Sequence, residues 1–422
     1  MYLSYKIKMA SDLLIYNIGT LVTSKEINMP HKNSMENIEI LKDAYVAIKN
    51  DHILFLGEGA YNEQFVDEKT ILIDAKKSVV TPGLIDSHTH LVHGGSRENE
   101  MFLKAKGATY MEILNAGGGI LSTVKATKES TKEELVEKAK ISLEKMLSFG
   151  VTTIESKSGY GLDLETEIKQ LEVNKILEKE QPIDIISTFM GAHAIPKEYK
   201  GRENEFIEKI IQMLPIIKEK NLAEFCDIFC EHGIFSIKQS REILNEAKRL
   251  GFKLKIHADE IESIGGAELA GELETTSSEH LMAISEGGIL ALKVSGVIAN
   301  ILPGTSFYLK KEYAPVRKMI EQGVQIALST DYNPGSCPTE NLQLIMQIAA
   351  LYLNMSPMEV IKAVTINGAK SLNKEEKIGS IEIGKKADLV IFNSKSLEYI
   401  LYHFGVNHTK MVIKNGKIVY SI

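Results

Sequence analysis

The sequence predicts an α/β protein, a (β/α)8 TIM barrel with a small β-sandwich domain formed by the N- and C-terminal segments. Short apolar, strand-like segments alternate with helical segments through residues 81–379, which is typical of parallel barrels. Segments 1–80 and 380–422 instead contain strand and turn patterns without a long amphipathic helix. The length of 422 residues suits a large barrel with an accessory domain.

Both ends of the chain contribute to the predicted small domain. Near the N-terminus, strand patterns cover residues 13–17, 44–48, 53–56 and 71–73, and Asn50-Asp51 suits a hairpin turn between the second and third. Near the C-terminus, residues 387–392, 411–414 and 417–420 read as strands, and Asn415-Gly416 is a strong type I′ hairpin signal. We therefore expect the barrel to be inserted between two halves of one β domain.

Eight strand candidates make up the predicted barrel. They are residues 84–90, 151–156, 185–192, 225–230, 254–258, 275–280, 296–301 and 326–331. Between the first two, Ser130 and Thr131 offer capping boxes for a helix that Gly150 ends. Polar side chains recur at the ends of these strands: His90, Glu155, His193, His257, His280 and Asp331. Active sites of such barrels lie at the C-terminal ends of the strands, so we expect the chemistry there.

Composition excludes several classes of function. The chain is 44% hydrophobic and 25% charged, with a net charge of -7 and no long basic run, so nothing points to nucleic acid or to an anionic membrane surface. Three cysteines are too few for a disulfide framework, and Cys226 and Cys230 suit core packing. The N-terminus lacks a signal-peptide pattern, and no apolar run approaches the ~20 residues of a membrane span. We expect a cytoplasmic enzyme that acts on a small molecule.

The strongest site signal is His88-Thr89-His90 at the end of the first barrel strand. Alternate side chains of a strand point to the same face, so the two imidazoles lie together. His257 and Asp331 end the fifth and eighth strands. Three imidazoles and one carboxylate suit Zn²⁺ or iron and leave one position for water. Such a site can activate water for hydrolysis.

Four further residues are candidates for proton transfer or substrate binding, and each has a structural alternative. Glu260 and His280 could move a proton, but Glu260 could also be a solvated loop acid and His280 a support for a metal ligand. Arg97 could bind a substrate carboxylate or form a surface ion pair with Glu98 or Glu100. Tyr160 lies between two glycines, which suits either a binding loop or a turn with a packed tyrosine.

The motifs as a group resemble those of the amidohydrolase superfamily and, within it, the imidazolonepropionase family. His-x-His on strand one, histidines on strands five and six and Asp on strand eight carry the superfamily resemblance. The finer resemblance covers the whole barrel and lies in His88–Glu100 (HTHLVHGGSRENE), Glu155–Leu162 (ESKSGYGL), Phe189–His193 (FMGAH), His257–Glu260 (HADE), Leu302–Thr305 (LPGT) and Thr330–Ser336 (TDYNPGS). Departures are small: Ser87 replaces a common proline and Tyr332 a common phenylalanine.

The resemblance implies hydrolysis of the cyclic amide of 4-imidazolone-5-propanoate to N-formimidoyl-L-glutamate, a step of histidine degradation. It implies one Zn²⁺ or Fe³⁺ per chain, held by His88, His90, His257 and Asp331, because residues 229–231 lack the lysine of binuclear relatives. Glu260, His280 and Asp331 would share the proton transfers. The implied substrate-binding residues are Arg97, Tyr160, His193, Glu260, Asn333, Gly335 and Ser336. A homodimer is also implied.

Two rival interpretations stay open at this point. The first is another amidohydrolase reaction, on a different cyclic amide or as an aminohydrolase, which a panel of substrates would distinguish. The second is a non-catalytic barrel that serves as a scaffold. The presence of His88, His90, His257 and Asp331 argues against a scaffold, and a metal assay separates the two.

Overall fold

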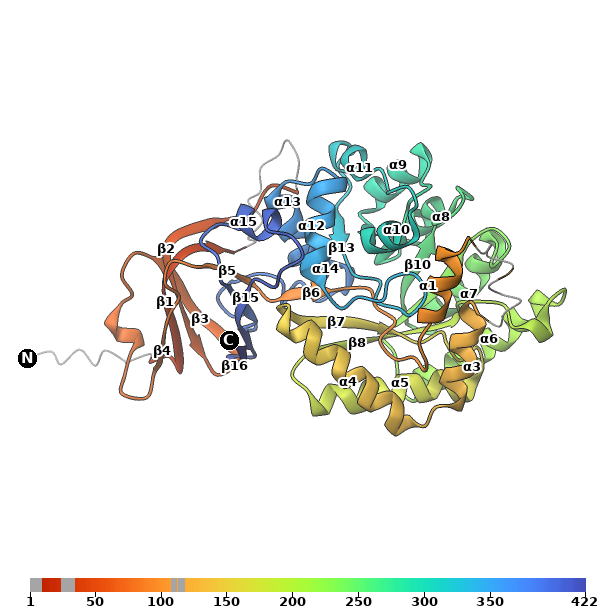
Figure 1. Cartoon of the computed structure of the whole chain (residues 1–422), viewed down its shortest axis with the longest axis horizontal. Helices are drawn as coiled ribbons and strands as arrows, with labels where there is room; N and C mark the ends of the chain where they lie inside the picture. Colours follow the sequence, from red (N-terminus) through yellow and green to blue (C-terminus); the bar gives the residue numbers. More distant parts are fainter. Residues whose placement is uncertain (1–9, 24–34, 108–111, 113–117) are drawn as a thin grey trace, which may run out of the picture.

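The structure, a computed structural model, describes residues 10–23, 35–107, 112 and 118–422. It contains two eight-stranded sheets. Figure 1 shows the barrel beside a smaller sheet built from both ends of the chain. The predicted fold class is therefore confirmed, with a parallel barrel and a separate terminal β domain.

The small sheet joins the two ends of the chain by hydrogen bonding. Its strands are β1 (Leu13–Val22), β2 (Ile40–Lys49), β3 (His52–Glu58), β4 (Ile71–Asp74), β5 (Val79–Pro82), β14 (Leu389–Phe392), β15 (Thr409–Lys414) and β16 (Lys417–Ser421). The order is β16-β15-β14-β5-β1-β2-β3, with β4 paired to β1. The antiparallel pair of β5 and β14 connects the halves. Asn50, Asn415 and Gly416 adopt positive φ, as the two predicted hairpin turns require.

The barrel strands match the predicted positions closely. They are β6 (Leu84–Asp86), β7 (Val151–Lys157), β8 (Asp184–Ala192), β9 (Phe225–Cys230), β10 (Lys253–Ala258), β11 (Ser277–His280), β12 (Ile298–Ile301) and β13 (Ile326–Leu328). Neighbours pair in parallel from β6 to β13. Two backbone hydrogen bonds join the ends of this path, from Asp331 N to His88 O (3.1 Å) and from His90 N to Tyr332 O (2.9 Å).

The first and last barrel strands are shorter than the sequence predicts. Regular pairing ends at Asp86 in β6 and at Leu328 in β13, whereas the prediction continued to residues 90 and 331. Beyond those points the two segments bond to each other, through a bridge between Thr89 and Tyr332. Because this contact joins segments far apart in sequence, local patterning does not reveal it. It fixes the backbone that carries His88, His90 and Asp331.

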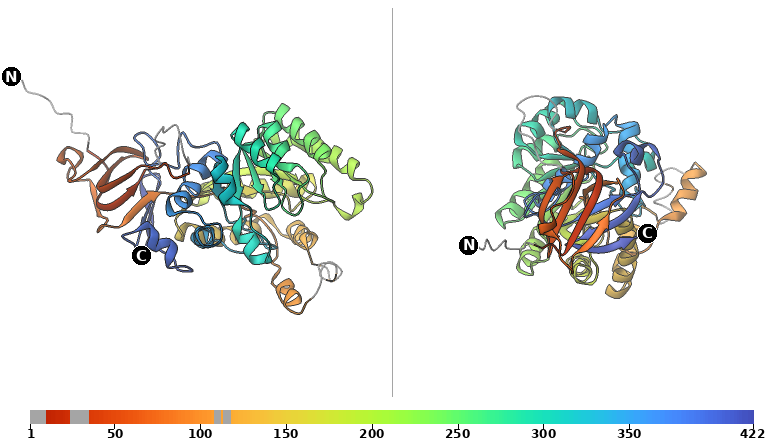
Figure 2. Two further views of the ribbon diagram at one scale, coloured as in Figure 1. Left: turned by 90° about the horizontal axis from the view of Figure 1, so that it is seen from above. Right: turned by 90° about the vertical axis from the view of Figure 1, so that its left-hand side faces the viewer.

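Helices surround the barrel strands, as the two views in Figure 2 show. They are α1 (Glu98–Ala105), α3 (Ile120–Glu129), α4 (Lys132–Ser148), α5 (Leu164–Glu180), α6 (Glu203–Glu219), α7 (Ile237–Arg249), α8 (Gly266–Leu273), α9 (Glu286–Ser295), α10 (Pro303–Leu309), α11 (Val316–Gln322), α12 (Leu342–Tyr352), α13 (Pro357–Ala363), α14 (Ile366–Ser371) and α15 (Leu397–Tyr402), with short 3-10 turns η1 (Glu63–Phe65) and η2 (Lys197–Tyr199). Thr131 and Glu134 form the predicted capping box of α4.

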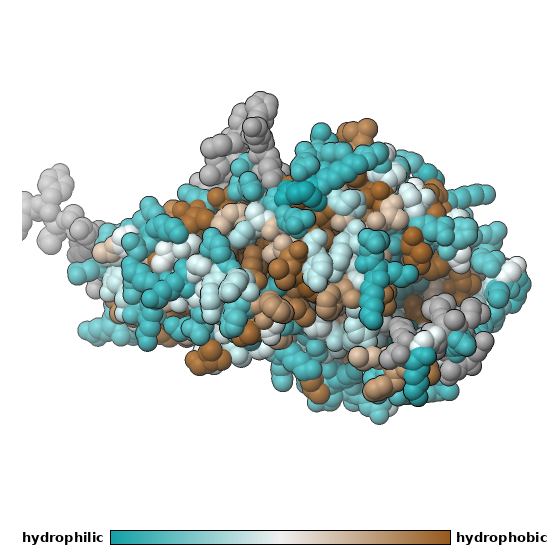
Figure 3. All heavy atoms as spheres, turned by 45° about the horizontal axis from the view of Figure 1, so that its top comes forward, coloured by the Kyte–Doolittle hydropathy of each residue, from teal (hydrophilic) through white to brown (hydrophobic). Residues whose placement is uncertain are grey.

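The largest apolar cluster is centred on the barrel strands and their helices, and it also includes Val22, Val79, Val390 and Phe392 of the terminal sheet. A smaller cluster packs on the terminal sheet. Cys226, Cys230 and Cys337 are buried and free of disulfides. Figure 3 shows hydrophobic residues mainly in the middle of one face, with hydrophilic residues dominant at both ends. No helix among the described residues is long and apolar enough to cross a membrane.

Candidate metal centre

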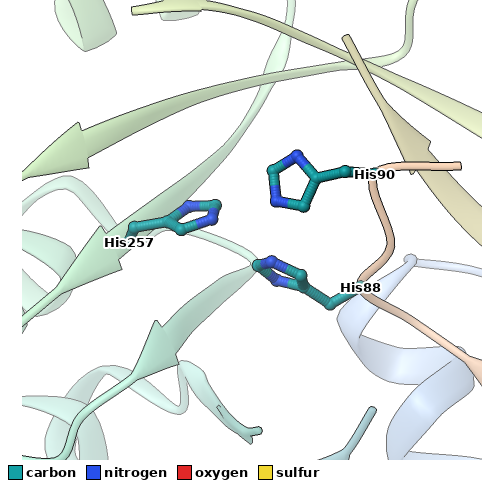
Figure 4. Close-up of side chains that lie close together, drawn as sticks. All are labelled: His88, His90 and His257. Carbon is teal, nitrogen blue, oxygen red and sulfur yellow. The ribbon is translucent and has the colours of Figure 1, made fainter. Parts of the chain in front are cut away.

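Three imidazoles meet at the C-terminal end of the barrel. His88 and His90 follow β6, and His257 lies near the end of β10. Their rings face one another in Figure 4. One nitrogen from each ring lies within 4.8 Å of the others, and all three residues are buried. The structure thus brings together three of the four predicted ligands, which come from segments far apart in the sequence.

Asp331, in the segment that follows β13, completes the set. Its Oδ1 lies 3.5 Å from His88 Nε2 and 3.6 Å from His90 Nε2. Its Oδ2 accepts a hydrogen bond from Thr305 Oγ1 (2.6 Å), and the residue has a positive φ of 55°. Burial raises the pKa of this carboxyl group to about 6. A buried carboxyl group among imidazoles suits a cation at this position.

Hydrogen bonds to carboxylates orient two of the three imidazoles. His88 Nδ1 lies 2.8 Å from Glu279 Oε2, and His257 Nδ1 lies 3.1 Å from Asp227 Oδ1. An ionised carboxylate can only accept, so each Nδ1 carries the proton and each Nε2 presents its lone pair. Neither Nε2 has a hydrogen-bond partner among the described residues. Unpartnered, buried lone pairs directed at one point fit a bound metal ion.

A buried ionic network lies beneath these carboxylates. Lys157 Nζ contacts Asp227 Oδ2 (2.7 Å) and Glu155 Oε2 (2.8 Å). Lys255 Nζ lies 3.5 Å from Glu155 and 3.7 Å from Glu279. Burial opposes the charge on Lys157, but the carboxylates of Asp227 and Glu155 raise its pKa above the ordinary value. The two lysines therefore hold in place the carboxylates that orient His257 and His88.

Glu260 and His280 lie on one side of the metal cluster. Glu260 Oε2 is 3.5 Å from His280 Nε2, and the His280 ring centroid is 5.2 Å from that of His257. Burial, and then the negative charge of Asp331, raise the pKa of Glu260 to about 8. Burial lowers the pKa of His280 well below its ordinary value. At neutral pH Glu260 therefore holds a proton beside a neutral imidazole.

Tyr160 and His193 lie against the opposite side of the cluster. The His193 ring stacks on His90 with centroids 4.9 Å apart, and Tyr160 lies 5.2 Å from His193. His193 Nδ1 donates to the Gly159 carbonyl (3.0 Å), because a carbonyl only accepts. Glu167 on α5 accepts backbone N–H bonds from residues 159, 161 and 162. Helix α5 thus holds in shape the loop that carries Tyr160.

The remaining predicted residues lie on two adjoining loops. Arg97 forms a bidentate ion pair with Glu100, one of the two acids that the sequence offered as partners. The Arg97 side chain is only 15% exposed. Asn333 uses its amide within its own loop, donating to Ser336 Oγ and accepting from Gly335 N, both at 2.8 Å. The Arg97 guanidinium lies directly against Gly335. Ser336 Oγ is 3.4 Å from Asp331 Oδ2, which connects this corner to the metal cluster.

Comparison with known proteins identifies the family of the chain. Residues 79–419 match the model of the amidohydrolase family. An imidazolonepropionase of Fusobacterium nucleatum is 58% identical over 98% of this chain and 100% of its own length. One of Alkaliphilus oremlandii is 59% identical over 97% of this chain and 98% of its own length. The chain belongs to the imidazolonepropionases of the amidohydrolase family. It is therefore a hydrolase of a cyclic amide, as the sequence predicted.

Solved structures show the same fold at much lower identity. A zinc-bound adenosine deaminase from Xanthomonas campestris superimposes with a TM-score of 0.73 at 18% identity, covering 98% of this chain and 93% of its own. A guanine deaminase from E. coli gives 0.74 at 15% identity, covering 97% and 99%. Family membership and the donor cluster together support a divalent metal ion in this imidazolonepropionase-family chain.

Several residues of the site were missing from the sequence-based prediction. Asp227, Lys255 and Glu279 support the metal cluster and had no predicted role, whereas Glu100 had been considered only as a surface partner of Arg97. One signal was available, since charged residues interrupt the apolar strands at positions such as Asp227 in Phe225–Cys230. Their partners, however, come from other strands of this imidazolonepropionase-family barrel, and strand periodicity alone does not identify them.

Proposed function

We propose that this chain hydrolyses 4-imidazolone-5-propanoate to N-formimidoyl-L-glutamate at the centre formed by His88, His90, His257 and Asp331. One observation carries the assignment of the ligands: His88 and His257 direct unpartnered, buried Nε2 lone pairs at one point. When bound there, Zn²⁺ or Fe³⁺ would supply Lewis-acid activation of water and of the ring carbonyl. His88 belongs to both potential metal-binding groups found among the described residues, which supports a single ion per chain.

The protein's own groups divide the remaining work. In the reaction, the oxygen of water bonds to the ring carbonyl carbon, the ring carbon–nitrogen bond breaks, and the nitrogen takes a proton. Asp331, whose Oδ1 lies 3.5 Å from His88 Nε2, and His280, whose pKa is lowered by burial, accept the proton of the water. Glu260, protonated at neutral pH, is placed to supply the proton to the ring nitrogen. His280 and Asp331 are buried and the Glu260 side chain is only 15% exposed, which limits the access of bulk water to these transfers.

The substrate's other groups meet the surrounding side chains. Arg97 binds the propionate carboxylate and orients the ring. Tyr160 and His193 contact the ring from the side of His90, and Asn333, Gly335 and Ser336 contact it from the loop after β13. Burial lowers the pKa of His193 to about 3, so it binds as a neutral hydrogen-bonding group. The predicted homodimer, cytoplasmic location and domain boundaries at residues 80 and 380 stay proposals.

Removal of the metal tests the proposal most directly. We expect purified protein to contain about one metal ion per chain and to hydrolyse freshly prepared imidazolone propionate, because the family and the donor set imply one site. Chelation should abolish turnover, and added Zn²⁺ or Fe²⁺ with air should restore it. Elemental analysis and loss of substrate absorbance measure both. Bound metal without turnover would indicate that the substrate is a different cyclic amide. Unchanged turnover by metal-free protein would refute the metal centre.

Substitution of Arg97 tests the binding of the carboxylate. We expect Arg97→Ala to raise KM by about tenfold to a hundredfold, because a charge-assisted bidentate contact is lost. Metal content should be unchanged, since Arg97 is not among the donors. Steady-state kinetics and elemental analysis provide the comparison. An unchanged KM would contradict the role of Arg97.

A further inference from the structure

Arg97 is held in a fixed orientation by Glu100. Arg97 Nε donates to Glu100 Oε1 and Nη2 donates to Oε2, each at 2.8 Å. The exposed fractions of the two side chains are only 15% and 8%, so water competes weakly for this pair. A guanidinium is planar with donors on more than one edge. The contact with Glu100 uses the Nε–Nη2 edge. The other edge, formed by the two Nη groups, does not face Glu100.

Glu100 is itself anchored, so it is more than a mobile surface partner. Its Oε1 also accepts the backbone N–H of Gly119 at 2.7 Å. Gly119 is the residue that precedes α3, whereas Glu100 lies in α1. The carboxylate of Glu100 therefore joins the two helices and fixes the place of the guanidinium relative to both. This arrangement limits Arg97 to one position.

Gly335 provides the space that the guanidinium occupies. A Cβ atom added at Gly335 would lie 2.1 Å from Arg97 Nη1 and 2.8 Å from its Cζ. Gly335 is not among the residues with positive φ, so its backbone conformation does not itself require glycine. The reason for glycine at this position is the close approach of Arg97. The same loop places Ser336 beside Asp331, so the guanidinium enters the site at the edge of the metal cluster.

We propose that Glu100 and Gly335 are specificity-determining partners of Arg97. Glu100 fixes one edge of the guanidinium, Gly335 admits Nη1, and the edge formed by the two Nη groups is presented to a single carboxylate on a short arm of the substrate ring. This inference rests on the proposed role of Arg97 in binding that carboxylate. Because the guanidinium cannot move toward a carboxylate in another position, the site discriminates between ligands by the length of the arm that carries the acid.

Ligand affinity provides the test, with imidazole-4-propanoate as the anionic probe and 4-methylimidazole as the probe without the acid. We expect wild-type protein with its metal to prefer the acid. Glu100→Ala and Gly335→Ala should each reduce that preference about tenfold or more, the size of a lost charge-assisted hydrogen bond. The KM for the substrate should rise in parallel, with kcat changed by less than about threefold. Imidazole-4-acetate should gain relative to the propanoate in Gly335→Ala.

Controls separate positioning from damage to the fold. Glu98→Gln alters an acid of the same helix whose carboxylate contacts Ser96 rather than Arg97, and it should leave both affinities unchanged. In an Arg97→Ala background, Glu100→Ala and Gly335→Ala should have no further effect on the preference for the acid. Additive losses, or a stronger preference for the acid in Glu100→Ala, would overturn the inference. Wild-type hydrolysis of the substrate tests the proposed function separately, because the affinity ratio does not depend on turnover.

Discussion

The His257→Ala variant is expected to lose both its bound metal and its hydrolytic activity. His257 directs a buried, unpartnered Nε2 at the same point as His88, and Asp227 holds its ring in the ligating orientation. Removing the ring leaves at most three of the four donors and a hole in the site. Because the Lewis-acid contribution amounts to several kcal/mol, kcat/KM should fall by roughly a thousandfold or more. Elemental analysis after gel filtration and steady-state kinetics measure the two losses.

A matched histidine controls for effects unrelated to the metal. His232 follows β9 near the same end of the barrel, but its side chain is 74% exposed. His232→Ala should therefore retain full metal content and activity. Circular dichroism should show the same secondary structure for both variants. Full metal occupancy in the His257→Ala variant would contradict the ligand assignment, and loss of metal from the His232→Ala variant would show that alanine substitution at this rim acts indirectly.

The barrel was predictable because its signals are local. Apolar strand segments recur between helical segments, and all eight predicted strands overlap the observed ones. The polar residues at the strand ends could be assigned to one face because parallel strands point the same way. That argument placed His88, His257 and Asp331 together before any contact was known. The sequence pattern made the first and last strands too long. The segments that follow β6 and β13 bond to each other instead of continuing regular strand pairing.

The supports of the site were less predictable because they depend on contacts between distant segments. The sequence motifs assigned no role to Lys157, which lies at the end of β7 and pairs with Asp227 on β9. Gly335 was expected to contact substrate, and its close contact with Arg97 was not foreseen. Sequence identifies which residues have the required chemistry. It does not give the distances that distinguish a metal ligand from a residue that orients a ligand or from one that only lies nearby.

The Glu260→Gln variant is expected to retain its metal but lose most of its turnover. Glu260 is not among the residues that could hold the metal, and its carboxyl group lies 3.5 Å from His280. Glutamine preserves the size of the side chain but cannot give up a proton as a carboxylic acid does. Loss of a positioned general acid typically lowers kcat by about a hundredfold to ten-thousandfold. Elemental analysis and kcat therefore separate this variant from His257→Ala.

The pH profile gives a second measure of the same role. Burial raises the pKa of Glu260 to about 8, so the protonated, active form is present below that pH and is lost as the pH rises through it. The wild-type rate should therefore fall on the alkaline side, and this decline should disappear from the residual activity of Glu260→Gln. Glu262, two residues later and 60% exposed, provides the matched control, since Glu262→Gln should keep the wild-type rate and profile. A Glu260→Gln variant with near wild-type kcat would instead leave His280 and Asp331 as the groups that handle both protons.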